Sequence, residues 1–182
     1  MSNLSLPRSA KFPMELEVSY ARDLNPASPT FYSVGGAQAT ENTPYYWQVS
    51  LLVDTPEQGE FLEANGIPVK TVGANAKRNA GKKYISLKRN VKRRDGSDNG
   101  QVICTDPNGN PVTNFDNIGE GSMATFEVYQ LANNMQPGRV VSSLTSLQFT
   151  KLNENAEAEA VVLEMPSSKP VEKSTQAVEA PF

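Results

Sequence analysis

The chain of 182 residues contains no histidine and a single cysteine, Cys104. Without imidazole, Ser-His-Asp and Cys-His nucleophilic sites and zinc sites that use histidine are excluded. One cysteine also excludes an intrachain disulfide, a CxxC redox motif and a thiolate metal cluster. Because Cys104 follows Val102 and Ile103, we interpret it as a small buried hydrophobe. We expect no cofactor and no metal site.

Long apolar runs are also missing. Nowhere do about 18 apolar residues follow one another, and residues 1–13 hold no apolar core of a signal peptide. We therefore expect a cytoplasmic protein without a membrane anchor.

Three glutamates, Glu57, Glu60 and Glu63, recur every third residue, and we interpret them as the solvated face of a helix. No catalytic constellation is evident, so we predict a protein that is not an enzyme, with a carboxylate-only nuclease as a remote alternative.

The charges are strongly segregated along the chain, although the formal net charge is only −3. Residues 67–94 contain ten basic side chains and no acidic one. Residues 152–182 contain six glutamates against two lysines. This separation is more informative than the net charge, because it indicates one basic surface and one acidic appendage.

Hydrophobic periodicity predicts a β-rich body with one helix. Apolar residues alternate over 14–20, with Met14 and Tyr20 expected on the core face, and over 45–53, with Trp47 in the core. Thr55 as N-cap and Gly66 as terminator predict a helix that ends near residue 64, with Phe61 and Leu62 packing inward. Further strands are expected over 82–92, 101–105, 122–131 and 139–152.

Five to seven short strands and one helix favour a small barrel over a parallel βαβ sheet. We expect residues 1–152 to form this domain. After Leu152 the composition changes to a mixture rich in Glu, Pro, Ser and Ala without sustained periodicity. We therefore expect residues 153–182 to be a disordered acidic tail.

The segment 81–94, GKKYISLKRNVKRR, is the strongest functional candidate. As a strand it directs Ile85, Leu87 and Val91 toward the core and leaves an aromatic ring flanked by ammonium groups on the opposite face. Single-stranded nucleic acid is bound by such a surface, because bases stack on the ring for about 1–3 kcal/mol each and cations follow the phosphates. The predicted DNA-binding residues are Lys77, Arg78, Lys82, Lys83, Tyr84, Lys88, Arg89, Lys92, Arg93 and Arg94, with Tyr46 and Tyr129 as further stacking candidates.

Other interpretations of these residues stay open. Lysines also protect exposed edge strands from aggregation, although ten cations without an acid exceed that need. Tyr46 and Tyr129 could instead cap the core. The tail end, with Glu179, Pro181 and Phe182, could dock into a pocket of a partner protein, fold back on the basic strand, or only improve solubility.

Several short motifs resemble the replicative single-stranded DNA-binding proteins of T7-like phages. The stretch 105–111, TDPNGNP, looks like that family's Asp-x-x-Gly-x-Pro hairpin, and 117–122, NIGEGS, is similar to its Gly-x-Gly-Ser turn. The closing strand that ends in 147–152, LQFTKL, and an acidic tail with a terminal Phe complete the pattern. This tail is less densely acidic than that of the family, and its Ala-Pro-Phe end looks more like the tip of bacterial single-stranded DNA-binding proteins.

The resemblance implies an OB-fold, cooperative or homodimeric coating of single-stranded DNA, strand annealing, and contact with replication proteins through the tail. It thus predicts a protein that binds single-stranded DNA of any sequence during phage DNA replication and recombination, in the cytoplasm of the bacterial host. The alternative class is a β-rich structural protein of the virion, which would explain the strands and turns but not the segregated charge.

Overall fold

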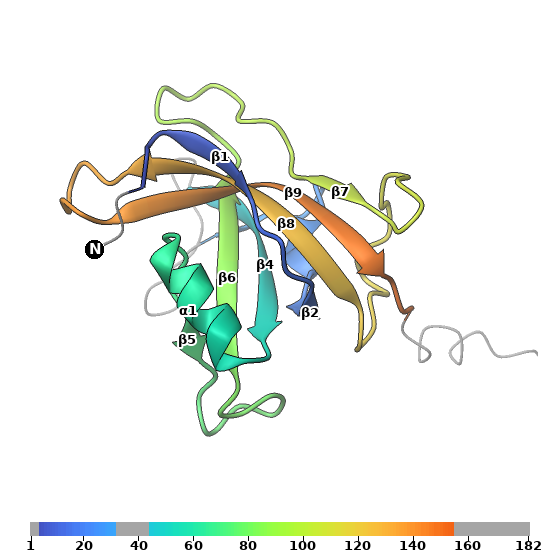
Figure 1. Ribbon diagram of the computed structural model, residues 1–182. Coiled ribbons are helices and arrows are strands. Elements are labelled where there is room, and N and C mark those ends of the chain that lie inside the picture. The colour runs from blue at the N-terminus through green and yellow to red at the C-terminus, as the bar shows by residue number, and fades with distance from the viewer. Residues whose placement is uncertain (1–3, 32–43, 155–182) are drawn as a thin grey trace, which may run out of the picture.

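A computed structural model describes residues 4–31 and 44–154 of the chain. Along the described residues, the strands are interrupted by one 3-10 turn and by one α-helix, which Figure 1 labels α1. The elements are β1 (Arg8–Lys11), β2 (Leu16–Tyr20), η1 (Arg22–Leu24), β3 (Thr30–Phe31), β4 (Tyr45–Val53), α1 (Pro56–Ala64), β5 (Lys70–Thr71), β6 (Lys83–Asn90), β7 (Ile103–Thr105), β8 (Met123–Ala132) and β9 (Val140–Lys151).

Five of these strands close into a barrel. The sequential pairs β2–β4 and β4–β6 are antiparallel, β6 then pairs β9 in parallel, and the antiparallel pairs β9–β8 and β8–β2 complete the circle. This order is that of an OB-fold, a five-stranded Greek-key barrel. The predicted OB-fold-like barrel with one short helix is therefore confirmed.

The barrel interior is filled by the alternate residues that the sequence pattern assigned to it. Trp47, Val49 and Leu51 of β4 are buried, as are Ile85 and Leu87 of β6. In a strand, side chains alternate between the two faces, so the intervening residues must point outward. The inner and outer faces of β4 and β6 are thus fixed.

The prediction for the first strand is wrong in one respect. Tyr20 is 44% exposed and does not share the core face of Leu16 and Val18. The pairing register of β2 with β4 shifts between Val18 and Tyr20, and such a bulge changes the face to which the next side chain points. Tyr20 consequently lies opposite Ser50 on the outer side of β4.

Helix α1 begins and ends as predicted. The Thr55 side chain accepts a hydrogen bond from the Gln58 backbone N–H at 3.2 Å, and the Gln58 side-chain oxygen accepts one from the Thr55 backbone N–H at 3.3 Å, which completes a capping box. Leu62 is fully buried, but the expectation that Phe61 packs inward is wrong, because Phe61 is 44% exposed and meets Phe12 only edge-on.

Gln130 joins the end of this helix to the barrel. It is fully buried, and its amide donates to the Asn65 carbonyl at 2.6 Å and to the Ser142 hydroxyl at 2.9 Å. Its oxygen accepts from the Arg8 guanidinium at 2.7 Å. Gly66 follows with a φ of +87°, and a Cβ there would lie 3.0 Å from Val140. The close approach of helix and barrel therefore requires glycine.

In the part of the chain that the structure describes, no helix has the length and apolar character needed to cross a membrane.

The first residues of the predicted tail contact the barrel domain. The Gly119 backbone N–H donates to the Asn153 carbonyl at 2.6 Å, and Ile118 forms a β-bridge with Glu154. Backbone contacts with the barrel thus continue two residues past Leu152. The predicted tail otherwise lies outside the described residues.

Candidate nucleic-acid interface

The outer face of β4 and β6 brings together the most promising of the predicted residues. Cross-strand neighbours on this face are Tyr46 with Asn90, Gln48 with Lys88, and Ser50 with Ser86. Most of these side chains are polar and none belongs to the core. The face is therefore a polar surface with aromatic rings, and not a second hydrophobic layer.

Strand β6 is not an edge strand. It pairs β4 along one side, and β5 and β9 along the other. The interpretation of its lysines as edge protection is therefore wrong, because β6 lies inside the sheet, between β4 and β9.

Lys88 and Tyr46 form a cation–π contact on this face. The ammonium nitrogen lies 4.6 Å from the centroid of the Tyr46 ring, within the distance at which a ring attracts a cation. Both side chains reach outward, and Lys88 is exposed. The pair thus presents one ring and one positive charge at the same place on the surface.

Tyr84 lies on the same face near the start of β6, where β5 extends the sheet. Its Cα partners are Leu52 on β4 and Lys70 on β5. Lys70 is exposed, and as the cross-strand partner of Tyr84 it belongs to the same face of the sheet. Lys70 is not among the predicted DNA-binding residues, because its position depends on the pairing of β5 with β6 across a loop.

Tyr20 adds a third aromatic side chain, held by Asp23. The Tyr20 hydroxyl donates to the Asp23 carboxylate at 3.4 Å, and the Gln48 amide donates to the same group at 3.0 Å. Burial and the Asp23 carboxylate together raise the pKa of Tyr20. Only the bulge in β2 could have revealed this residue, and a single sequence gives no clear sign of a bulge.

Arg89 lies apart from the other predicted residues. Its Cα partner is the buried Trp47, and its guanidinium donates to the carbonyls of Gly100, at 2.8 Å, Asn99 and Leu144. Burial, and then the charge of Arg93, lower the pKa of Arg89. Arg89 therefore fastens the segment after β6 to the barrel.

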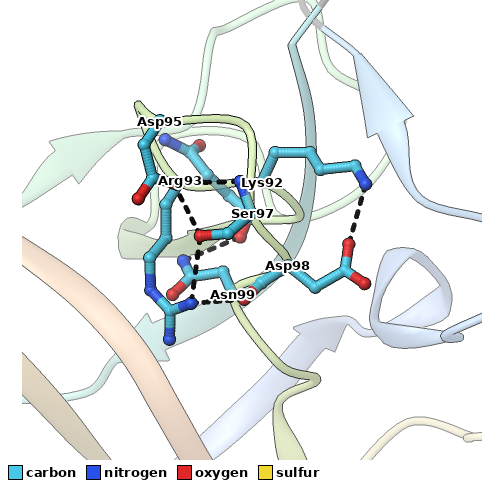
Figure 2. A network of polar contacts seen from close by, with 7 residues as sticks. Lys92, Arg93, Asp95, Ser97, Asp98 and Asn99 are labelled. Atoms are coloured by element: carbon cyan, nitrogen blue, oxygen red, sulfur yellow. Dashed lines mark hydrogen bonds and ion pairs between the residues drawn. The ribbon is translucent and has the colours of Figure 1, made fainter.

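The residues after β6 form a tight polar turn (Figure 2). Lys92 pairs with Asp98 at 2.8 Å, and Arg93 donates to the Ser97 hydroxyl at 3.3 Å. Hydrogen bonds from Ser97 lower the pKa of Asp95. Arg94 is exposed and forms no ion pair within the described part of the chain. Among these three cations, Arg94 is the most accessible to a phosphate.

The loop 72–82 crosses from β5 back to β6 and is tied to the barrel at two points. Arg78 pairs with Glu120 at 2.7 Å, and the Asn79 amide donates to the Ser19 hydroxyl at 3.3 Å. Lys77 and Lys82 are exposed. Lys83 starts β6 and donates to the Thr71 hydroxyl at 2.7 Å. The cations of this loop thus border the outer face at the start of β6.

Tyr129 lies farther round the barrel. Lys88 is paired with Ser143 of β9, and Ser143 with Tyr129 of β8, so one strand separates Tyr129 from Lys88. Its side chain is 39% exposed and outward. The structure does not group it closely with Tyr46 and Tyr84, although all three lie on the outer surface.

Cys104 is buried, and burial raises its pKa to about 12, as expected for a structural thiol. Residues 4–31 and 44–154 contain no group of three or more acidic, Cys or His side chains that could hold a metal ion. Glu179, Pro181 and Phe182 lie outside the described residues.

No protein-family model matches the chain, and no curated protein matches it. Among solved structures, the fold is similar to the crystal structure of gp2.5, a single-stranded DNA binding protein encoded by bacteriophage T7. The sequence identity is 13% and the TM-score 0.43, with 90% of this chain and 99% of that chain covered. At this level of similarity the function has to be argued from the site itself.

Proposed function

We propose that this protein binds single-stranded DNA without sequence preference on the outer face of β4 and β6. The observation that carries the proposal is the arrangement of Tyr46 and Tyr84 on one face, each beside a lysine, Lys88 and Lys70. Bases of any identity stack on a tyrosine ring, while ammonium groups follow the phosphates. In OB-folds, this pair of strands is the usual platform for oligonucleotides.

The charge distribution supports the same proposal. Lys77, Lys82 and Arg94 are exposed around the face, so a strand of DNA that leaves the rings meets positive charge at both ends of β6. Duplex DNA keeps its bases stacked inside the helix, and rings on a sheet face cannot reach them. We therefore expect single strands to be preferred over duplexes.

We further propose that the protein coats single strands in phage DNA replication and recombination, and that residues 153–182 recruit replication proteins. The support for recruitment is the chain's composition, six glutamates against two lysines in residues 152–182 and a terminal Pro181-Phe182. An apolar end on an acidic segment suits a partner pocket that is lined by basic residues. The same proposal includes the association of two copies of the protein on the DNA.

A binding titration tests the proposal. Fluorescence anisotropy with oligo(dT), duplex DNA and RNA at two salt concentrations should give tight binding to single strands and a log–log salt slope of about −0.7 for each phosphate neutralised. Tyr84→Ala should weaken binding by about 1–3 kcal/mol with little change in slope. Phe61→Ala removes an exposed ring on α1 that meets Phe12, which belongs to neither β4 nor β6, and serves as the matched control.

The opposite result is equally clear. A virion structural protein would show no affinity for oligo(dT) that depends on Tyr84. If Tyr84→Ala and Phe61→Ala bind alike, the face of β4 and β6 is not the DNA site.

A further inference from the structure

A cavity of about 460 Å³ opens on the outer side of the barrel, beside the start of β6. Its lining combines apolar side chains with charges of both signs. The apolar ones include Leu52 and Met123, the basic ones are Lys82 and Lys83, and the acidic ones include Glu15 and Glu17. Leu52 is the cross-strand partner of Tyr84. One residue of the cavity wall is therefore the cross-strand neighbour of a tyrosine of the proposed DNA surface.

The sheet register explains how the cavity is built. Met123 of β8, Glu17 of β2 and Leu52 of β4 lie in one row across three neighbouring strands. A carboxylate thus stands between two apolar side chains. The same row continues to Tyr84, so the row leads from the cavity to the aromatic platform.

The loop 72–82 supplies one wall. Its end, Gly81 and Lys82, lines the cavity, and the contacts of Arg78 with Glu120 and of Asn79 with Ser19 hold the loop against the barrel. These contacts bridge the loop to β2 and to the turn before β8. The wall is therefore fixed by the body of the protein.

Glu17 has no visible structural task. It is half-buried, and no side chain in the described part of the chain donates to it or pairs with it. Its carboxylate oxygens are not among the buried unpartnered atoms of the described residues, so they remain open to solvent and can accept a hydrogen bond from a ligand that displaces water. The free acceptor beside apolar surface fits a planar ligand that has an N–H donor on its edge.

We propose that this cavity receives one nucleobase of the bound strand and that Glu17 selects bases with an exocyclic amino group, cytosine above thymine. This inference rests on the proposed function and narrows it at one point, because the rings of the outer face accept any base and only the cavity prefers one. Carboxylates accept hydrogen bonds from cytosine N4, whereas thymine presents the O4 acceptor at the same place. The apolar side chains of Leu52 and Met123 would contact the faces of the base.

The charges around the cavity determine which part of the nucleotide enters. Glu15, Glu17 and Asp54 all line it, and their charge would repel a phosphate. Lys82 lines the same cavity and is exposed, so it can hold the phosphate next to the base. The arrangement therefore takes the base inward and leaves the backbone outside.

The test compares oligo(dC) with oligo(dT) of equal length, two pyrimidine strands of similar flexibility. We expect the wild-type protein to bind oligo(dC) about tenfold more tightly, the discrimination of one base contact. In Glu17→Gln the ratio should fall to near one, since an amide can donate to thymine O4 as well as accept from cytosine N4. Glu57→Gln, on the exposed first turn of α1, should leave the ratio unchanged.

A change in the ligand checks the same contact with the unaltered protein. Oligo(dC) carrying N4,N4-dimethylcytosine lacks the amino donor and should lose the tenfold advantage. Equal affinity of the wild-type protein for oligo(dC) and oligo(dT), with Tyr84→Ala still weakening both, would overturn the cavity proposal and leave the proposed function intact. No affinity for either strand would overturn both.

Discussion

Lys88 and Arg89 are neighbours in the chain, but their charged groups lie on opposite sides of β6. The Lys88 ammonium lies over the Tyr46 ring on the outer face, whereas the Arg89 guanidinium donates to backbone carbonyls on the side of Trp47. Two cations of one basic segment thus have different tasks. One is available to a phosphate, and the other is occupied by the protein.

This difference predicts opposite effects of two adjacent substitutions. Lys88→Ala should reduce the log–log salt slope of DNA binding by about 0.7 and change the free energy of unfolding by less than about 0.5 kcal/mol. Arg89→Ala should lower the free energy of unfolding by about 1–3 kcal/mol, because carbonyls of Asn99 and Gly100 lose a charged donor, and should leave the slope unchanged.

Salt titrations and urea denaturation measure the two effects. Lys11→Ala, an exposed lysine on β1, controls for the loss of a charge far from the face. A reduced slope in Arg89→Ala, at unchanged stability, would place Arg89 in the DNA site after all.

The sequence predicted the barrel strands well because their apolar residues alternate over long stretches. Strand β4 has the predicted bounds, and Ile85 and Leu87 of β6 are buried as expected. Tyr20 was misplaced because one bulge reverses the phase of its strand. Phe61 was misplaced because α1 buries only a narrow stripe, on which Leu62 lies.

The candidate site was predictable in its segment but not in its details. A run of cations identifies a basic surface, yet it does not tell which side chain is already bound by backbone carbonyls, as Arg89 is. Lys70 and Glu17 reach the face through pairing between distant segments. Such contacts leave no local pattern, because they are set by the register of the whole sheet.

The second prediction concerns Gln130. Gln130→Leu should lower the free energy of unfolding by about 1–3 kcal/mol, since it leaves the Asn65 carbonyl and the Arg8 guanidinium without a buried partner. Thermal and urea denaturation provide the measurement. Gln136→Leu, in the exposed turn between β8 and β9, is the matched control and should change stability by less than about 0.5 kcal/mol. Equal stability of the two variants would contradict a structural task for this network.

The third prediction concerns the only cysteine. Burial raises the pKa of Cys104 from its usual 9.0 to about 12, so the thiol should stay neutral and unreactive in the folded protein at pH 8. A thiol reagent should label it slowly in the native state and quickly in urea, with Cys104→Ser as the blank. Rapid native labelling would mean that the strand β7 opens readily.

The same shift gives a sign for the pH dependence. Because the folded pKa lies above the unfolded one, this group changes nothing below pH 9. Between pH 9 and about 12 the unfolded chain releases the proton first, and the stability should fall. Cys104→Ser should remove this part of the alkaline loss of stability in a comparison of urea denaturation at pH 8 and pH 10.

The last prediction separates two tasks of the C-terminal segment. Truncation after Glu154 keeps the contacts of Asn153 and Glu154 with the barrel and removes five glutamates and two lysines. If that segment competes with DNA for the basic face, truncation should tighten DNA binding, most strongly at low salt, where screening is weakest and charges act over longer distances.

Deletion of Phe182 alone leaves those glutamates in place. It should therefore hardly change the affinity for oligo(dT), yet it should abolish the binding of a replication partner if the terminal ring docks into a pocket. Titrations of both variants at two salt concentrations, with pull-down of host or phage replication proteins, distinguish the two tasks. Weaker DNA binding after truncation would instead make residues 155–182 part of the binding surface, because a competing polyanion can only reduce the affinity of the intact chain.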